Sequence, residues 1–230
     1  VVEGMNSNEE ILNNEENKTV EENEEELSFE ERFWQDRIND SFKDIKCDVP
    51  RPHNTSYSGK MIDAHFHIES LLDSMPDEEG EEDYGDPSER PVILGVDVTI
   101  DEIVCLFEYE GTERALSFFP VDPEIYEHAL EVVNITMERH PNKFYPFIMP
   151  PDRDDSPDGY PTVNDDILDA MLDVYPGLFD GYGEIGLYKR GERGGPEGAP
   201  ALPPDSQRLL KIYPLIKKNN LVVYFHLGEG

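Results

Sequence analysis

The sequence predicts an α/β fold in which parallel strands are joined by helices. From Lys60 onward, strand-like and helix-like apolar patterns alternate at about 35 residues per unit, as in strand–helix–strand units with right-handed crossovers. Metal-competent side chains fall in or at the end of three predicted strands, as His65 and His67, Glu184, and His226. Ligands of such folds bind at the carboxyl ends of the strands, so we expect these side chains to meet there. An open doubly wound sheet and a closed barrel both fit the alternation.

Residues 1–44 form an acidic arm in which Glu, Asn and Asp dominate. Too little apolar area is available there to offset the entropy of ordering, so most of the arm is expected to be disordered. The exception is 27–42, where apolar side chains lie near helical spacing and predict a helix that docks on the domain. These side chains are Phe29, Phe33, Trp34, Ile38 and Phe42. The domain itself then spans 45–230.

The first strand is predicted over 60–67, and its side chains alternate sharply between two faces. One face carries Asp63, His65 and His67. The other face carries the apolar side chains that we expect to pack against helices, namely Ile62, Ala64 and Phe66. The acidic stretch 73–90, rich in Gly, Pro, Asp and Glu, follows as a loop and lies beside the site.

The rest of the chain continues the alternation of helix and strand. Helices are predicted over 99–109, 123–140, 164–174 and 206–219. Strands are predicted over 114–119, 144–149, 179–187 and 221–226. Turn-forming residues place loops at 152–161 and 190–204.

The charge of the chain excludes some partners. A formal net charge of -33 would repel a phosphate backbone or an anionic membrane, so nucleic acid is not expected to bind directly. No apolar run reaches the roughly 18 residues of a membrane span. The two cysteines, Cys47 and Cys105, are too few for a disulfide framework and are expected to be structural or free. We expect a cytoplasmic protein, with export of a processed chain as the alternative; homo-oligomerisation stays open.

The spacing of the histidines indicates metal binding. On a strand, residues i and i+2 share a face, so His65 and His67 can hold one ion. The expected cofactor is therefore a divalent ion, Zn²⁺ before Mn²⁺, Fe²⁺ or Mg²⁺.

The segments that carry these residues resemble the amidohydrolase superfamily over roughly residues 60 to 230. His65-Phe-His67 is similar to the first-strand His-x-His motif, and His226 to the fifth-strand histidine. Glu184, in Gly-Glu-Ile-Gly-Leu, is similar to the fourth-strand glutamate of TatD-like hydrolases. The resemblance implies one or two divalent ions, because a carboxylate at this position can bridge two cations and neutralise charge that would otherwise repel. Tyr188 stands where those proteins usually have Asp, and His226-Leu-Gly is more similar to the amidohydrolase-related branch.

The resemblance implies a TIM-type (β/α) barrel and a metal-dependent hydrolase that uses a metal-activated water on a small amide, ester, lactone or related bond. The alternatives are a metal-dependent decarboxylase of the amidohydrolase-related branch, and a non-catalytic barrel protein. The family's general base, an Asp after the eighth strand, is expected beyond Gly230. Only about five of eight βα units are expected in these 230 residues.

The substrate is expected to be a small molecule. Arg153, Lys189 and Arg190 follow the third and fourth barrel strands and are candidates to anchor an anionic group, although an ordinary surface position is the plainer interpretation of each. Glu69 is near enough to join the site, and a solvated loop carboxylate is the plainer interpretation. The fifth strand is apolar on both faces, as in the interior of a parallel sheet.

Overall fold

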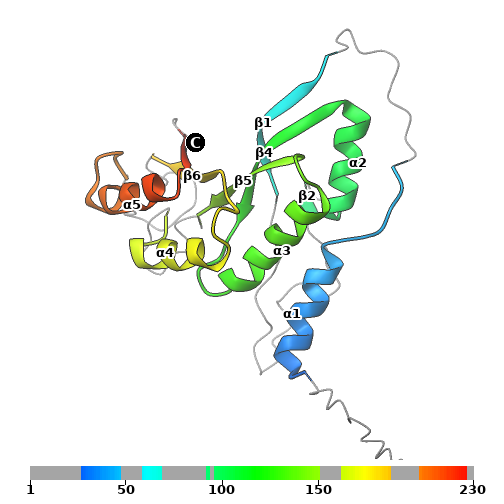
Figure 1. The fold of residues 1–230 in the computed structure, drawn as a ribbon, viewed down its shortest axis with the longest axis horizontal. Helices are drawn as coiled ribbons and strands as arrows, with labels where there is room; N and C mark the ends of the chain where they lie inside the picture. The colour runs from blue at the N-terminus through cyan, green and yellow to red at the C-terminus, as the bar shows by residue number, and fades with distance from the viewer. Residues whose placement is uncertain are drawn as a thin grey trace, which may run out of the picture.

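The computed structural model describes residues 27–47, 59–68, 92–93, 96–150, 162–187 and 202–226. Within them, five parallel strands form one curled sheet in the order β1-β4-β5-β6-β7 (Figure 1). These strands are β1 (Met61–His67), β4 (Thr112–Pro120), β5 (Phe144–Met149), β6 (Gly181–Gly186) and β7 (Val222–His226). The predicted α/β class, with parallel strands that alternate with helices, is therefore confirmed.

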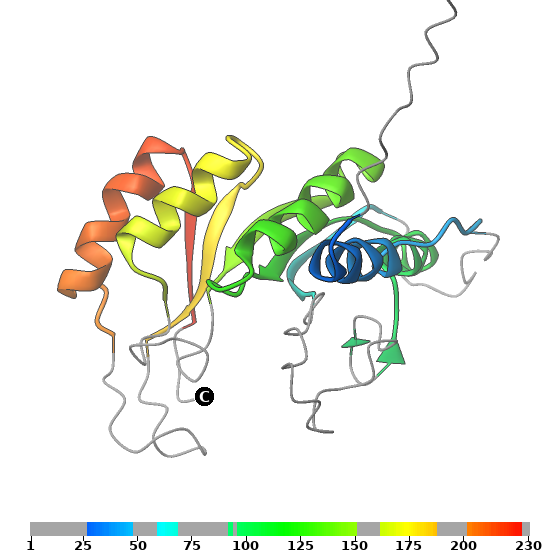
Figure 2. The same ribbon diagram turned by 90° about the horizontal axis from the view of Figure 1, so that it is seen from below.

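Five helices are described. Two precede β4 in the chain, α1 (Phe29–Asp40) and α2 (Ile100–Glu110). The other three connect the later strands, α3 (Tyr126–Arg139), α4 (Asp165–Val174) and α5 (Gln207–Lys218). The curve of the sheet and the helices α3, α4 and α5 along one side of it are visible in Figure 2. Within the described residues, no helix is long and apolar enough to cross a membrane.

Local capping signals set most helix boundaries. Ser28 and Thr99 each begin a helix with a capping box, in which the Glu three residues later bonds back to the cap amide. Ser206 caps α5 through the amide of Leu209. Gly111 ends α2 in the left-handed conformation, with φ 78°. The helices and the strands of the main sheet thus begin and end within a few residues of their predicted ranges.

One pair of short strands was not predicted from the sequence. β2 (Val92–Ile93) pairs antiparallel with β3 (Val96–Asp97) and lies apart from the main sheet. Each strand has two residues, which is too short for an alternation pattern to appear in the sequence.

The core lies between the sheet and the helices. Trp34 and Ile38 bring α1 into this core, with 3% and 2% of their surfaces exposed. The Trp34 ring stacks on the imidazole of His128 in α3 at 4.6 Å. The predicted docking of this helix therefore involves large buried side chains, whereas residues 1–26 lie outside the described part of the chain.

The segment 41–47 is fastened to the start of α2. The Ile100 amide donates to the Ser41 carbonyl at 3.0 Å, and the Lys43 amide donates to the Asp101 carboxylate at 2.6 Å. A disulfide joins Cys47 to Cys105 across a sequence separation of 58. The prediction that the cysteines are structural or free did not include this bond, because spacing says nothing about a pair that only the folded chain brings together.

The prediction for the apolar face of β1 is only partly right. The Phe66 ring meets Phe107 of α2 at 5.0 Å, as expected for a side chain that packs on a helix. Ile62 is 59% exposed, however, and Ala64 is also exposed. β1 is an edge strand of the sheet, so nothing in the described part of the chain covers these two side chains. Val222 on the opposite edge, in β7, is similarly 60% exposed.

Candidate metal centre

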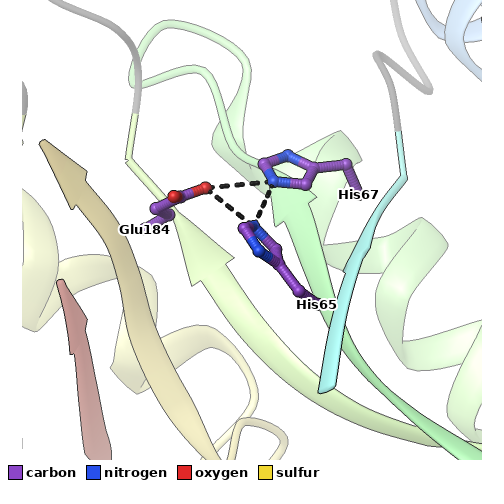
Figure 3. Close-up of side chains that lie close together, drawn as sticks. All are labelled: His65, His67 and Glu184. Atoms are coloured by element: carbon purple, nitrogen blue, oxygen red, sulfur yellow. Dashed lines mark hydrogen bonds and ion pairs between the residues drawn. The ribbon is translucent and has the colours of Figure 1, made fainter. Parts of the chain in front are cut away.

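The four residues predicted to bind metal meet at the carboxyl end of the sheet. His65 and His67 come from β1, Glu184 from β6, and His226 from β7. Figure 3 shows the two β1 imidazoles and the Glu184 carboxylate pointing toward one another. The strands β1 and β7 are opposite edges of the sheet, so its curl is what brings their side chains to one carboxylate.

The Glu184 carboxylate lies at the centre of the cluster. Its Oε2 is 3.0 Å from Nε2 of His65 and 3.0 Å from Nε2 of His67. The two Nε2 atoms are 2.8 Å apart. On the other side, Oε1 lies 2.5 Å from Nδ1 of His226, although Oε1 has no hydrogen bond of suitable geometry. One carboxylate thus contacts all three imidazoles.

The ligand atoms of His65, His67 and Glu184 form a compact set, all within 4.8 Å of one another. Their contacts make a nearly equilateral triangle whose corners lie about 1.7 Å from its centre, close to the roughly 2.0–2.2 Å at which zinc binds nitrogen and oxygen. His226 contacts the other carboxylate oxygen, Oε1 of Glu184, and is outside this set. Two imidazoles and a carboxylate oxygen suit zinc and related divalent ions, so the residues present fit the expected metal.

The Glu184 carboxylate is much more buried than the imidazole rings around it. The Glu184 side chain is 9% exposed, whereas the three histidine side chains are 40–43% exposed. A buried carboxylate oxygen without a hydrogen bond is costly unless a cation or another donor faces it. The cluster therefore has a buried carboxylate at its base and a solvent-facing rim of imidazole rings, through which an ion or a small molecule can approach.

An irregularity in β6 turns Glu184 toward the histidines. Tyr182 and Ile185 are both fully buried in the core, although residues three apart face opposite sides of a regular strand. The ladder between β6 and β7 shifts register between these same two residues. The extra residue in the interval lets Glu184 leave the face that Tyr182 occupies, as β-bulges beside functional sites commonly do.

Tyr182 anchors this bulge from the helix side. Its hydroxyl accepts a hydrogen bond from the Val163 amide at 3.3 Å and also bonds the hydroxyl of Thr162, at the approach to α4. Burial raises the pKa of Tyr182 to about 12, with these hydrogen bonds opposing the rise. The phenol is therefore neutral and holds β6 in place two residues before Glu184.

Glycines at the start of β6 make room for the Phe147 ring and for the backbone of β7. A Cβ atom at Gly181 would lie 2.0 Å from the Phe147 ring, and one at Gly183 would lie 2.2 Å from the Tyr224 carbonyl oxygen. Gly183 also has a φ of 132°, a backbone conformation that residues other than glycine rarely adopt. The Gly-Tyr-Gly-Glu sequence is thus required by packing as well as by the carboxylate.

Sequence reasoning missed an aromatic floor beneath the histidines. Phe118 of β4 is fully buried, and its ring lies 5.1 Å from His65 and 5.3 Å from His67. Phe147 and Tyr224 complete the floor, at 5.2 Å and 4.9 Å from Phe118. The signal was present in the alternation of each strand, because these aromatic residues occupy the same face as the ligands.

Other candidate site residues are not placed. Arg153, Lys189 and Arg190, predicted to anchor an anionic substrate, lie outside the described residues, as does Glu69. Asp63, which alternation predicted on the histidine face, accepts a hydrogen bond from the His65 amide at 2.9 Å. It supports the backbone of the ligand strand. The pairing of β1 with β4 shifts register between Asp63 and Phe66, so the simple alternation is interrupted between Asp63 and the histidines.

Comparison with known proteins found no matching family model, no matching curated protein and no matching solved structure. The fold and the cluster by themselves define an α/β protein with a curled parallel sheet and a candidate metal centre at the carboxyl ends of its strands. Any more specific assignment has to come from the chemistry of that centre.

Proposed function

We propose that this protein is a metal-dependent hydrolase of the amidohydrolase type, acting on a small amide, ester, lactone or related bond. One observation carries the proposal: Glu184 contacts His65, His67 and His226 at the carboxyl edge of a parallel sheet. That edge is where α/β enzymes bind their ligands. The residues come from strands far apart in the chain, and their order along it is that of the superfamily motifs.

The side chains of the cluster have separable roles. His65 and His67 offer two nitrogens on one side of the carboxylate, and His226 offers a third on the other side. Glu184 supplies the negative charge that a divalent ion needs in a partly buried place. A divalent ion held by such a set activates water and polarises a carbonyl or phosphoryl group. The exposed rims of the imidazoles leave a path for the substrate.

The finer fold assignment belongs to the same proposal. We propose that the curled sheet is part of an eight-stranded TIM-type barrel, in which β1 and β7 would each have a further neighbour. The exposed Ile62 and Val222 on these two edge strands support this, since strand edges with apolar side chains are usually covered.

The disulfide bears on where the protein works. Disulfides persist in oxidising compartments and are rare in the cytosol. The Cys47–Cys105 bond therefore supports the export alternative over a cytoplasmic location. We propose that the folded chain matures in an oxidising compartment.

Metal analysis of the purified protein tests the function. We expect stoichiometric zinc or another divalent ion in the wild type, and its loss in a His65→Ala/His67→Ala variant. His128→Ala is the matched control, because His128 stacks on Trp34 and is not one of the clustered side chains, so its loss should leave the metal content unchanged. A double variant that keeps stoichiometric metal would show that the ion binds elsewhere.

A panel of p-nitrophenyl esters, lactones and amides then separates an enzyme from a binding protein. Hydrolysis by the metal-loaded wild type, absent from the double variant, is the expected result. Metal binding without turnover on any class of bond would contradict the hydrolase and favour the non-catalytic alternative.

A further inference from the structure

Tyr224 joins the two edges of the sheet through the site face. It lies on β7, two residues before His226, and therefore on the same face as that histidine. Its ring centre is 5.5 Å from the imidazole of His65, which belongs to β1 at the opposite edge. The same ring packs edge-on against Phe118 at 4.9 Å.

The glycines of β6 permit this reach. β6 lies between β7 and the rest of the sheet, so ordinary side chains at its site-facing positions would fill the space next to β7. A Cβ atom at Gly183 would already meet the Cβ of Tyr224 at 3.1 Å. Because Gly183 has none, β6 and β7 approach closely and the Tyr224 ring can extend over β6 toward β4 and β1.

The His65 ring is held between two aromatic neighbours. Phe118 meets it edge-on at 5.1 Å, and Tyr224 meets it at 5.5 Å with an interplanar angle of 51°. His65 is 41% exposed, and its Nε2 contacts with Glu184 and His67 act only at the tip of the ring, so the two aromatic contacts restrain the orientation of the ring itself. Phe118 also contacts His67, whereas the contact of Tyr224 falls on His65.

We propose that Tyr224 is a positioning residue of the metal centre: its ring holds the His65 imidazole in the orientation in which Nε2 faces Glu184. This inference rests on the proposed metal site, and it assigns a role to a residue that does not itself offer a ligand atom to the cluster. Hydrogen-bonded neighbours that orient a metal-binding histidine typically change metal affinity about 10–100-fold when they are replaced, and we expect a ring that orients the histidine by packing to act on the same scale.

The affinity test uses the whole chain with Zn²⁺ alone, measured by competition with a chromophoric chelator. Tyr224→Leu should bind zinc about 10–100-fold more weakly, while Tyr224→Phe, which keeps the ring, should stay within about threefold of the wild type. Tyr145→Leu is the matched control, since Tyr145 is a half-buried tyrosine of β5 that contacts Arg114. Thermal melting of each variant reports whether it is folded; if Tyr224→Leu is not, Tyr224→Met gives the same comparison.

A second measurement does not depend on metal. The chain has six histidines, so the imidazole signals of the metal-free protein can be assigned by NMR with single histidine substitutions. Tyr224→Leu should remove the ring-current shift of the His65 signals, and Tyr145→Leu should not. Unchanged His65 signals in Tyr224→Leu would overturn the positioning role, as would a zinc affinity equal to that of the wild type. Equal weakening by Tyr224→Phe would assign the effect to the hydroxyl and overturn it too.

The two proposals fail in distinguishable ways. A wild type that binds no zinc refutes the metal centre, and with it the role of Tyr224 in ligand binding, even where the NMR shift shows that the ring contact exists. A wild type that binds zinc, with a Tyr224→Leu variant of equal affinity, keeps the metal centre and refutes the positioning role alone.

Discussion

Adding one methyl group at Gly183 should disrupt the site more than its size suggests. In Gly183→Ala the new Cβ would lie 2.2 Å from the Tyr224 carbonyl oxygen and 3.0 Å from its carbonyl carbon. Since the obstructing atoms are backbone, β6 and β7 have to separate, which weakens the ladder that pairs Gly181 with Val222 and Ile185 with Phe225. Glu184 is the next residue and would move with the strand.

The magnitude follows from two costs. A side chain in the conformation of Gly183, φ 132°, costs about 1–3 kcal/mol of backbone strain. Overpacking by one carbon costs about 1–3 kcal/mol more. The sum, roughly 2–6 kcal/mol, is a large part of the 5–15 kcal/mol by which a typical domain is stable.

Gly177→Ala provides the control. Gly177 also has a positive φ, 80°, but a Cβ there would meet nothing within 4 Å. Its substitution should therefore cost only the conformational part, about 1–2 kcal/mol. Urea denaturation of both variants measures the difference, and zinc titration measures the displacement of Glu184. Equal loss of stability in the two variants, or normal zinc binding by Gly183→Ala, would refute the claim that the close approach of β6 to β7 shapes the site.

Two further predictions concern the disulfide and the hydrogen bonds that join segment 41–47 to α2. Replacing both disulfide cysteines with serine should lower the free energy of unfolding by about 2–4 kcal/mol in urea, given the 58-residue separation, and should abolish the effect of a reductant on stability. Burial raises the pKa of Asp101, but hydrogen bonds outweigh it and the pKa is lowered overall; the donors are the Lys43 amide, Arg139 and His140. A lowered pKa adds stability that is present above the unfolded pKa of about 3.9 and is lost as the pH falls through the folded pKa. Asp101→Asn should therefore destabilise the protein strongly at neutral pH and less in acid. Urea unfolding midpoints measured across this pH range check the prediction.

The sequence predicted those features that depend on local patterns. Alternation along 60–67 placed His65 and His67 on one face, and turn and capping residues bounded helices such as α2 to within a residue or two. Some features that depend on contacts between distant segments were not predicted. The Cys47–Cys105 bond and the exposure of Ile62 both follow from which elements become neighbours or edges, which no local pattern encodes.

Glu184 illustrates the limit for the site itself. Its convergence with the histidines was expected, yet simple alternation would put it on the same face as Tyr182, which is buried against the helix side. Only the irregular pairing of β6 resolves this conflict. The aromatic floor was readable from alternation at Phe118 and Tyr224, but its importance depends on the curl that brings β7 toward β1.

The curl of the sheet leads to a final prediction, which is that bound metal stabilises the folded protein. The candidate ligands come from both edge strands and from β6, so an ion bound there connects segments that separate when the chain unfolds. An ion that binds the folded state alone should stabilise it by about 2.7 kcal/mol at a free concentration 100 times its dissociation constant. Urea unfolding in buffered Zn²⁺ and in chelator measures this difference, with His65→Ala/His67→Ala as the control expected to show none. An equal stabilisation of the double variant would mean that zinc binds to other acidic groups of this highly charged chain, and that the histidine cluster is not the site that connects the two edges of the sheet.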